Sequence, residues 1–218
     1  MLVRLPPLFT RQHNDWRKPT PEKWQGITIN TSGQAAILDL GEMPLAAPLR
    51  VSELAALWTP ALCVLSLSGP MIRGRLEHIC KASNLRTLAL GRTGLKGDLR
   101  ALGDLKGLKR LNLEGSSKLA GSVNVLKTCI LLENVILNNN RNISGNIEAF
   151  SNMPELQVLS VEMTAVLGHI ECLRACRKLH TLKCKHTRVV GDTHTLLRAV
   201  PLCDAREILA LNQRLDVE

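Results

Sequence analysis

Six glycines recur along the chain at intervals of 23 or 24 residues, and this period limits what the chain can fold into. An apolar residue stands two positions before each glycine, and a leucine stands eleven positions after each one. Self-similarity at a fixed period of this length is typical of a repeat array in which each unit packs on its neighbours. The chain is therefore predicted to form a solenoid. The six glycines are Gly74, Gly97, Gly121, Gly145, Gly168 and Gly191.

A second pattern begins at each of these leucines and predicts a short strand. Its spacing is seen in Leu85-x-x-Leu88-x-Leu90 and Leu156-x-x-Leu159-x-Val161. Alternating apolar residues indicate a strand with one buried face. Stacked strands lie ~4.8 Å apart, so their buried faces join into one continuous core. The apolar residues after each glycine predict short 3-10 or helical turns on the other side of the stack.

The complete repeat, L-x-x-L-x-L-x-x-x-x-L-x-G-x-I/L, resembles the plant-type subclass of leucine-rich repeats over about residues 35–203. The resemblance implies an α/β leucine-rich-repeat solenoid of about seven repeats of 23–27 residues. A single curved parallel sheet would line its concave face, and short 3-10 or helical turns its convex face. The subclass carries an asparagine after the strand, which Asn140 matches, whereas Thr93, Thr164 and Thr187 take that place in other repeats. The usual proline of the subclass is missing, which bears on the convex structure and not on the solenoid.

The segments on both sides of the array are expected to close it. Residues 1–34 are predicted to be an N-terminal extension and cap, because Trp16 and the run from Trp24 to Ile27 resemble the tryptophan-containing cap of such proteins. A large side chain is a suitable lid for an exposed first coil. Residues 35–203 form the predicted repeat array. Residues 204–218 are expected to be a C-terminal cap with a short amphipathic helix, or the start of a truncated repeat.

Composition and motifs argue against an enzyme. Only 2% of the residues are aromatic and tyrosine is absent, which suits thin leucine-rich layers better than the bulky centre of a globular enzyme. The sequence contains no phosphate-binding loop, nucleophile elbow, HExxH zinc motif or dinucleotide fingerprint. No nucleophile, base and orienting residue can be matched by their spacing. No catalytic residue and no cofactor are therefore predicted.

The seven cysteines indicate reduced thiols, because their number is odd and most of them occupy apolar repeat positions. One cluster has the side-chain types that bind zinc, but the repeat distributes it over strand, loop and convex segment, so no metal is predicted. Cysteine usage and a poor secretory signal predict an intracellular, reducing compartment, either the cytoplasm or an organelle. No stretch approaches the ~20 apolar residues of a membrane span. The cluster consists of Cys172, Cys176, His180, Cys184 and His186.

Charge and register together predict a partner-binding surface. The net charge of +9 favours an acidic partner, and basic residues concentrate between positions 174 and 188. Side chains beside the inward leucines point into the concavity. The polar members of this set and the basic end are predicted to bind the partner: Arg110, Asn112, Asn134, Asn138, Glu162, Thr181, Lys183, Lys185, His186 and Arg188.

The leading hypothesis is a non-enzymatic protein-binding scaffold or assembly subunit, a component of a complex rather than a homo-oligomer. The alternative is a structural component of a ribonucleoprotein, or an RNA-binding accessory, that contacts the phosphate backbone through the basic coils. Base stacking is not expected, because no aromatic residue falls on the predicted concave strand positions. A steep loss of binding with salt would distinguish the RNA hypothesis from the scaffold hypothesis.

Overall fold

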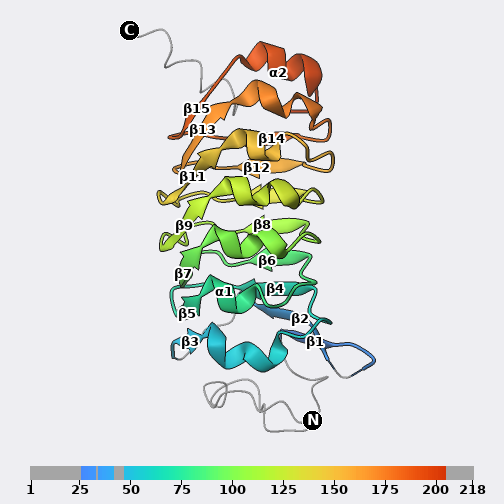
Figure 1. The fold of residues 1–218 in the computed structure, drawn as a ribbon, viewed down its shortest axis with the longest axis vertical. Coiled ribbons are helices and arrows are strands. Elements are labelled where there is room, and N and C mark those ends of the chain that lie inside the picture. Colours follow the sequence, from blue (N-terminus) through green and yellow to red (C-terminus); the bar gives the residue numbers. More distant parts are fainter. Residues whose placement is uncertain (1–25, 33, 42–46, 205–218) are drawn as a thin grey trace.

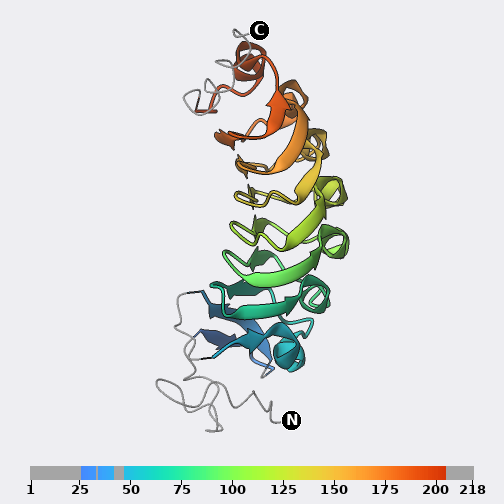
Figure 2. The ribbon, with the colours of Figure 1, turned by 90° about the vertical axis from the view of Figure 1, so that its left-hand side faces the viewer.

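The computed structural model describes residues 26–32, 34–41 and 47–204, which form one curved stack of coils (Figure 1). Each coil runs through a strand on the concave side, a strand of a second sheet and a short helical turn, and the next coil stacks on it. Turned by 90°, the stack bends as an arc with the helical turns on its outer side (Figure 2). The predicted leucine-rich-repeat solenoid is confirmed.

The concave sheet has eight strands in the order of the chain. β1 pairs with β2 in antiparallel fashion, with Ile27 opposite Leu38, and every later pair is parallel. The first apolar residue of each predicted alternation lies in one of these strands, and the second lies in the strand or directly after it. The strands are β1 (Ile27–Ile29), β2 (Ala35–Leu40), β4 (Val64–Leu67), β6 (Thr87–Ala89), β8 (Arg110–Asn112), β10 (Asn134–Ile136), β12 (Val158–Ser160) and β14 (Thr181–Lys183).

A second sheet of seven strands corrects the expectation of a single sheet. It is parallel as well, and it covers one lateral side of the stack, which faces the viewer in Figure 2. Five of the six recurring glycines lie within its strands, and Gly191 directly follows the last one. They are β3 (Leu49–Arg50), β5 (Ile72–Arg75), β7 (Gly94–Asp98), β9 (Leu119–Ser122), β11 (Ile143–Asn146), β13 (Ala165–His169) and β15 (Arg188–Val190).

Short helical turns line the convex side, as predicted. A polar residue caps several of them: Asp98, Ser122 and Asn146 each accept a hydrogen bond from the backbone N–H two residues further on. The turns are η3 (Val51–Leu57), α1 (Leu76–Ile79), η4 (Leu99–Asp104), η5 (Val123–Thr128), η6 (Ile147–Phe150), η7 (Ile170–Ala175) and α2 (Thr193–Ala199).

The core is one continuous column of aliphatic side chains between the two sheets and the convex turns. Each coil contributes the inward residues of both its strands and of its helical turn. In the coil that contains β10, for example, Val135, Leu137, Ile143, Ile147 and Phe150 are all fully buried. Because such thin layers are filled by leucine, isoleucine and valine, the scarcity of aromatic residues has a structural reason.

The glycine period is explained by the close approach of successive coils. Gly145 has a φ of +111°, a conformation that side-chain-bearing residues rarely adopt. A Cβ atom there would lie 2.5 Å from Ser122 Oγ and 3.0 Å from the backbone nitrogen of Val123, both in the preceding coil. A side chain at Gly145 would thus have an unfavourable φ, and its Cβ atom would crowd Ser122 and Val123 at the start of the preceding helical turn.

A buried polar row follows the concave strands at the position of the expected asparagine. Asn140 donates hydrogen bonds through Nδ2 to the backbone oxygens of Leu113 and Leu137, both at 2.8 Å. In the threonine repeats the hydroxyl donates to the carbonyl oxygen three residues earlier, as from Thr164 Oγ1 to Val161 O at 2.6 Å, and Thr93 Oγ1 also lies 2.9 Å from Ser116 Oγ in the next coil. The resemblance to the plant-type motif therefore extends to the function of this position, with hydroxyls in place of most of the amides.

The expected ends lie mostly outside the described residues. This applies to Trp16, Trp24 and residues 205–218, whereas Ile27, the last residue of the cap-like run, is the first residue of β1. Among the described helices, none has the length and apolar character needed to cross a membrane.

Candidate binding surfaces

The register of the concave sheet places the predicted polar residues in rows that run along the array. Arg110 pairs with Asn134, which pairs with Val158, and this residue pairs with Thr181. A neighbouring row contains Asn112, Ile136, Ser160 and Lys183. Asn138, Glu162 and Lys185 follow the ends of their strands in the same phase. The surface that the sequence predicted from spacing alone is thus continuous across the middle and last coils.

Two asparagines of this face are held by hydrogen bonds to their oxygens. Asn112 Oδ1 accepts from the backbone N–H of Glu114 at 2.9 Å. Asn138 Oδ1 accepts from Ser160 Oγ at 2.8 Å and from the backbone N–H of Glu162 at 2.9 Å. Within the part of the chain that the structure describes, their amide nitrogens donate no hydrogen bond. Fixed donors that face the concavity are suited to bind carbonyl or carboxylate oxygens of a partner.

One ion pair borders the rows. Lys109 Nζ lies 2.8 Å from Glu133 Oε1, and the guanidinium of Arg110 lies 3.9 Å from Glu133 Oε2. The hydrogen bond from Lys109 lowers the pKa of Glu133, and the charges of Lys109 and Arg110 act in the same direction. The carboxylate therefore stays ionised, and the middle of the concave face is polar without a large net charge.

The basic end does not form one patch. Arg174 lies on the convex turn η7, Lys183 and Lys185 belong to the concave side, and Arg188 lies in β15 of the second sheet. Part of this positive charge is also neutralised by an ion pair, because Lys178 Nζ lies 2.7 Å from Glu155 Oε2. The basic residues that are contiguous in the sequence are thus wrapped around the last coils.

Two of the predicted site residues do not lie on the concave face. His186 lies in the loop between β14 and β15, and Arg188 begins the outer strand of the second sheet. Within the described ranges, His186 is one of four non-glycine residues with positive φ, at +57°. The others, Arg92, Asn139 and Met163, take the same place in earlier coils, where Gly69 and Gly115 also have positive φ. A ridge of left-handed residues therefore separates the concave sheet from the second sheet.

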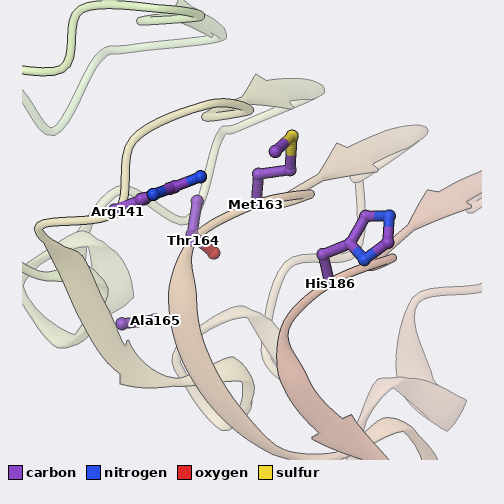
Figure 3. A pocket seen from close by; sticks show the side chains of 5 residues that line it. All are labelled: Arg141, Met163, Thr164, Ala165 and His186. Carbon is purple, nitrogen blue, oxygen red and sulfur yellow. The ribbon is translucent and has the colours of Figure 1, made fainter.

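A cavity of about 340 Å³ opens beside this ridge at the C-terminal end of the stack (Figure 3). It is formed by loops of three successive coils. The sequence prediction missed every lining residue except His186, although an apolar methionine at a position filled in the other coils by glycine or by a polar residue was a signal. The lining residues are Arg141, Met163, Thr164, Ala165 and His186.

The cysteines are dispersed and do not build a metal site. In the described ranges, no group of three or more cysteine, histidine or acidic side chains could hold a metal ion. All seven thiols are free. Burial raises the pKa of Cys80 and of Cys184 to about 12, and that of Cys172 and of Cys203 to about 11.

The raised thiol pKa values predict a loss of stability at alkaline pH. Between the ordinary pKa of 9.0 and the folded-state value of about 12, Cys184 keeps its proton only in the folded chain. The free energy of unfolding should therefore be independent of this thiol below pH 9.0 and fall as pH rises above it, by up to about 1.4 kcal/mol per pH unit. Urea unfolding across this pH range should show a shallower decline for Cys184→Ala. An unchanged decline would contradict the assignment.

Solved structures share this fold, although no protein-family model and no curated protein matches the sequence. A plant ice-binding protein superposes with a TM-score of 0.69 at 20% identity, over 84% of this chain and 60% of that one. The plant peptide hormone receptor RGFR1, solved in complex with RGF2, gives a TM-score of 0.65 at 19% identity, over 84% and 36%.

A third similar structure is the LRR ectodomain of the plant membrane receptor kinase GASSHO1/SCHENGEN3 from Arabidopsis thaliana, in complex with CASPARIAN STRIP INTEGRITY FACTOR 2. It has a TM-score of 0.60 at 18% identity, over 92% of this chain and 30% of that one. The chain thus spans between 30% and 60% of the length of these three proteins. Similarity at this level of identity shows a shared fold.

Proposed function

Because the chain has the leucine-rich-repeat fold of the plant-type subclass, we propose that it is a non-enzymatic scaffold whose concave face binds a protein partner. The observation that carries this proposal is the set of preorganised donors on a rigid sheet. Asn112 and Asn138 are held by bonds to their amide oxygens, so their N–H groups can bind a partner without a loss of side-chain freedom. Two of the similar proteins were solved as complexes, a plant peptide hormone receptor with RGF2 and a receptor kinase ectodomain with CASPARIAN STRIP INTEGRITY FACTOR 2, which supports a binding role.

The chemistry of the described cavity supports a non-enzymatic role. Its lining includes an arginine and a histidine but no carboxylate and no thiol. The four thiols with a pKa of about 11 or 12 stay protonated at neutral pH, and only the thiolate is a strong nucleophile. The protonated thiols are consistent with the proposed non-enzymatic role.

The distribution of basic residues favours a protein partner over RNA. Binding to a phosphate backbone needs several cations along one path. Here Arg174, Lys185 and Arg188 lie on the convex, concave and lateral sides of the same coils. We propose that Lys183 and Lys185 steer an acidic partner toward the concave face. The proposed reducing, intracellular location rests on the seven free thiols.

The test is a pair of matched double variants used to retain partners from a native extract. Asn112→Arg with Asn134→Arg places two long side chains in the concave rows. Ser83→Arg with Asn152→Arg adds the same charge at exposed positions in the turns that follow α1 and η6. The concave variant should lose the partner by at least about tenfold, as expected when a buried contact is blocked, and the control variant should keep it.

Nuclease treatment and a high-salt wash decide between the two classes of partner. A protein that survives nuclease on the wild type, but is lost from the concave variant, supports the scaffold. Loss of every retained protein on nuclease treatment would contradict the scaffold and favour contact with a phosphate backbone, for which binding also falls steeply with salt.

A further inference from the structure

Exposed apolar side chains gather on the second sheet at its C-terminal end. Leu167 in β13 and Val190 in β15 are each 40% exposed, and Met163 in the loop before β13 is 38% exposed. In the adjacent strand β11, the exposed residue of the same sheet is Ser144, which is small and polar. Clustered exposed aliphatic side chains on a folded chain are typical of an interaction site. These three residues account for a large part of the exposed large hydrophobics in the described chain.

The apolar residues continue into the cavity beside the ridge. Ala165 and Leu167 alternate along β13 and therefore share its outer face. Ala165 also lines the cavity, together with Met163 and Thr164 (Figure 3). The register places Leu167 opposite Arg188 of β15. Cavity and strand face thus form one surface, which we call the lateral surface: Arg141, Met163, Leu167, His186, Arg188 and Val190.

The charge of the lateral surface is positive. Arg141 reaches over the cavity from one side, and His186 stands on the other side (Figure 3). Within the described ranges, neither Arg141 nor Arg188 has an ion-pair or hydrogen-bond partner for its guanidinium. Arginine presents a planar set of donors that matches a carboxylate. The two guanidinium groups can therefore bind acidic side chains of another molecule.

The acidic residues that follow in the chain do not neutralise this surface. Glu171 Oε1 accepts a hydrogen bond from the backbone N–H of Asp192 at 2.6 Å. Asp192 in turn caps α2, where it accepts from the backbone N–H groups of His194 and Thr195. Both carboxylates are held at the helical turns of the convex side.

Met163 is kept at a position that glycine would fill with less strain. Its φ is +53°, and its N–H donates to Lys185 O in the next coil at 3.0 Å. The same ladder contact is made by Gly115, whose N–H donates to Asn138 O at 2.9 Å. A residue with a side chain is strained in such a conformation, whereas glycine is not. A methionine retained there despite this strain indicates a use for its flexible, polarizable side chain.

We propose that the lateral surface is a second docking site, separate from the concave face, for an extended acidic segment of a partner protein. Leucine-like side chains of the segment cover Met163, Leu167 and Val190. Carboxylates of the segment pair with Arg141 and Arg188. The positive charge argues for an acidic occupant, and the apolar centre between the arginines excludes a purely polar polyanion.

The proposal is tested with the full chain and a labelled peptide that has two leucines flanked by glutamates, followed by fluorescence anisotropy. The wild type should bind this peptide in a saturable manner, and a matched peptide with lysines for glutamates should not bind. Arg141→Glu and Met163→Gly should each weaken binding at least about tenfold. Met163→Gly is informative because it removes a wall of the cavity while relieving the backbone.

Asn139→Gly is the matched control, since it makes the same backbone change one coil earlier and outside the cavity. It should bind the peptide like the wild type. The concave double variant at Asn112 and Asn134 should also bind like the wild type, so this result is independent of the proposed concave function. Equal binding by Met163→Gly and the wild type would overturn the proposal. So would an absence of peptide binding, or equally tight binding of a single-stranded RNA.

Discussion

Replacing Phe150 with alanine is expected to lower the free energy of unfolding by about 3–5 kcal/mol. Phe150 ends η6 and is fully buried in the middle of the stack. η6 packs against η5 of the preceding coil and η7 of the following one. Since each coil is stabilised by its neighbours alone, a cavity at this point weakens two interfaces at once. Urea unfolding followed by circular dichroism measures the change.

Ile130→Ala is the control for this variant. Ile130 is 52% exposed, so its truncation should change the free energy of unfolding by about 0.5 kcal/mol or less. An equal loss in both variants would show that the convex layer is not packed as described. A broad, multiphasic transition in Phe150→Ala alone would still be consistent with the packing, because the two halves of the stack would then unfold separately.

Asn140→Ala is expected to lower the free energy of unfolding by about 1–3 kcal/mol. The change removes Nδ2 and leaves the buried carbonyl groups of Leu113 and Leu137 without this donor. The amide oxygen of Asn140 is itself buried without a partner, so its removal offsets part of the cost. The same urea measurement applies.

Asn140→Thr should be less harmful than Asn140→Ala. A threonine at this position keeps one of the bonds, as Thr164 does with Val161 O. Asn142→Ala serves as control, because Asn142 is exposed and its bond to Ser117 O, at 3.1 Å, is accessible to water. If Asn140→Thr were as unstable as Asn140→Ala, the hydroxyls of the threonine repeats would not be equivalent to the amide of Asn140.

The concave strands could be predicted from sequence because alternate burial leaves a period of two. In β10, Val135 is buried between the half-exposed Asn134 and Ile136. The second sheet leaves no such signal. In β11, Ile143 is the one buried residue, and Gly145 takes the place where a second apolar side chain would stand. A strand with a single inward side chain has no periodicity to detect.

The concave rows were equally predictable, since a fixed register brings each strand position beside its equivalent in the next coil. The lateral surface was not, because Arg141, Met163 and His186 belong to three different loops. Their proximity follows from the left-handed ridge, and the sequence records that ridge only as an alternation of glycine and asparagine with bulkier residues. A methionine or histidine at such a position can be recognised as unusual only when its positive φ is known.

The parallel register of the concave sheet also fixes the distance between equivalent positions on successive strands, and therefore the spacing of the contacts that a bound peptide could make. Strands lie ~4.8 Å apart, so every second coil repeats at ~9.6 Å. A segment in the polyproline II conformation turns once in three residues and advances ~3.1 Å per residue, or ~9.3 Å per turn. Laid along the stack, such a segment would present every third side chain to alternate coils, with Asn112 and Ser160 two strands apart in one row. A partner segment bound to the proposed concave face in this conformation would therefore contact it through every third residue.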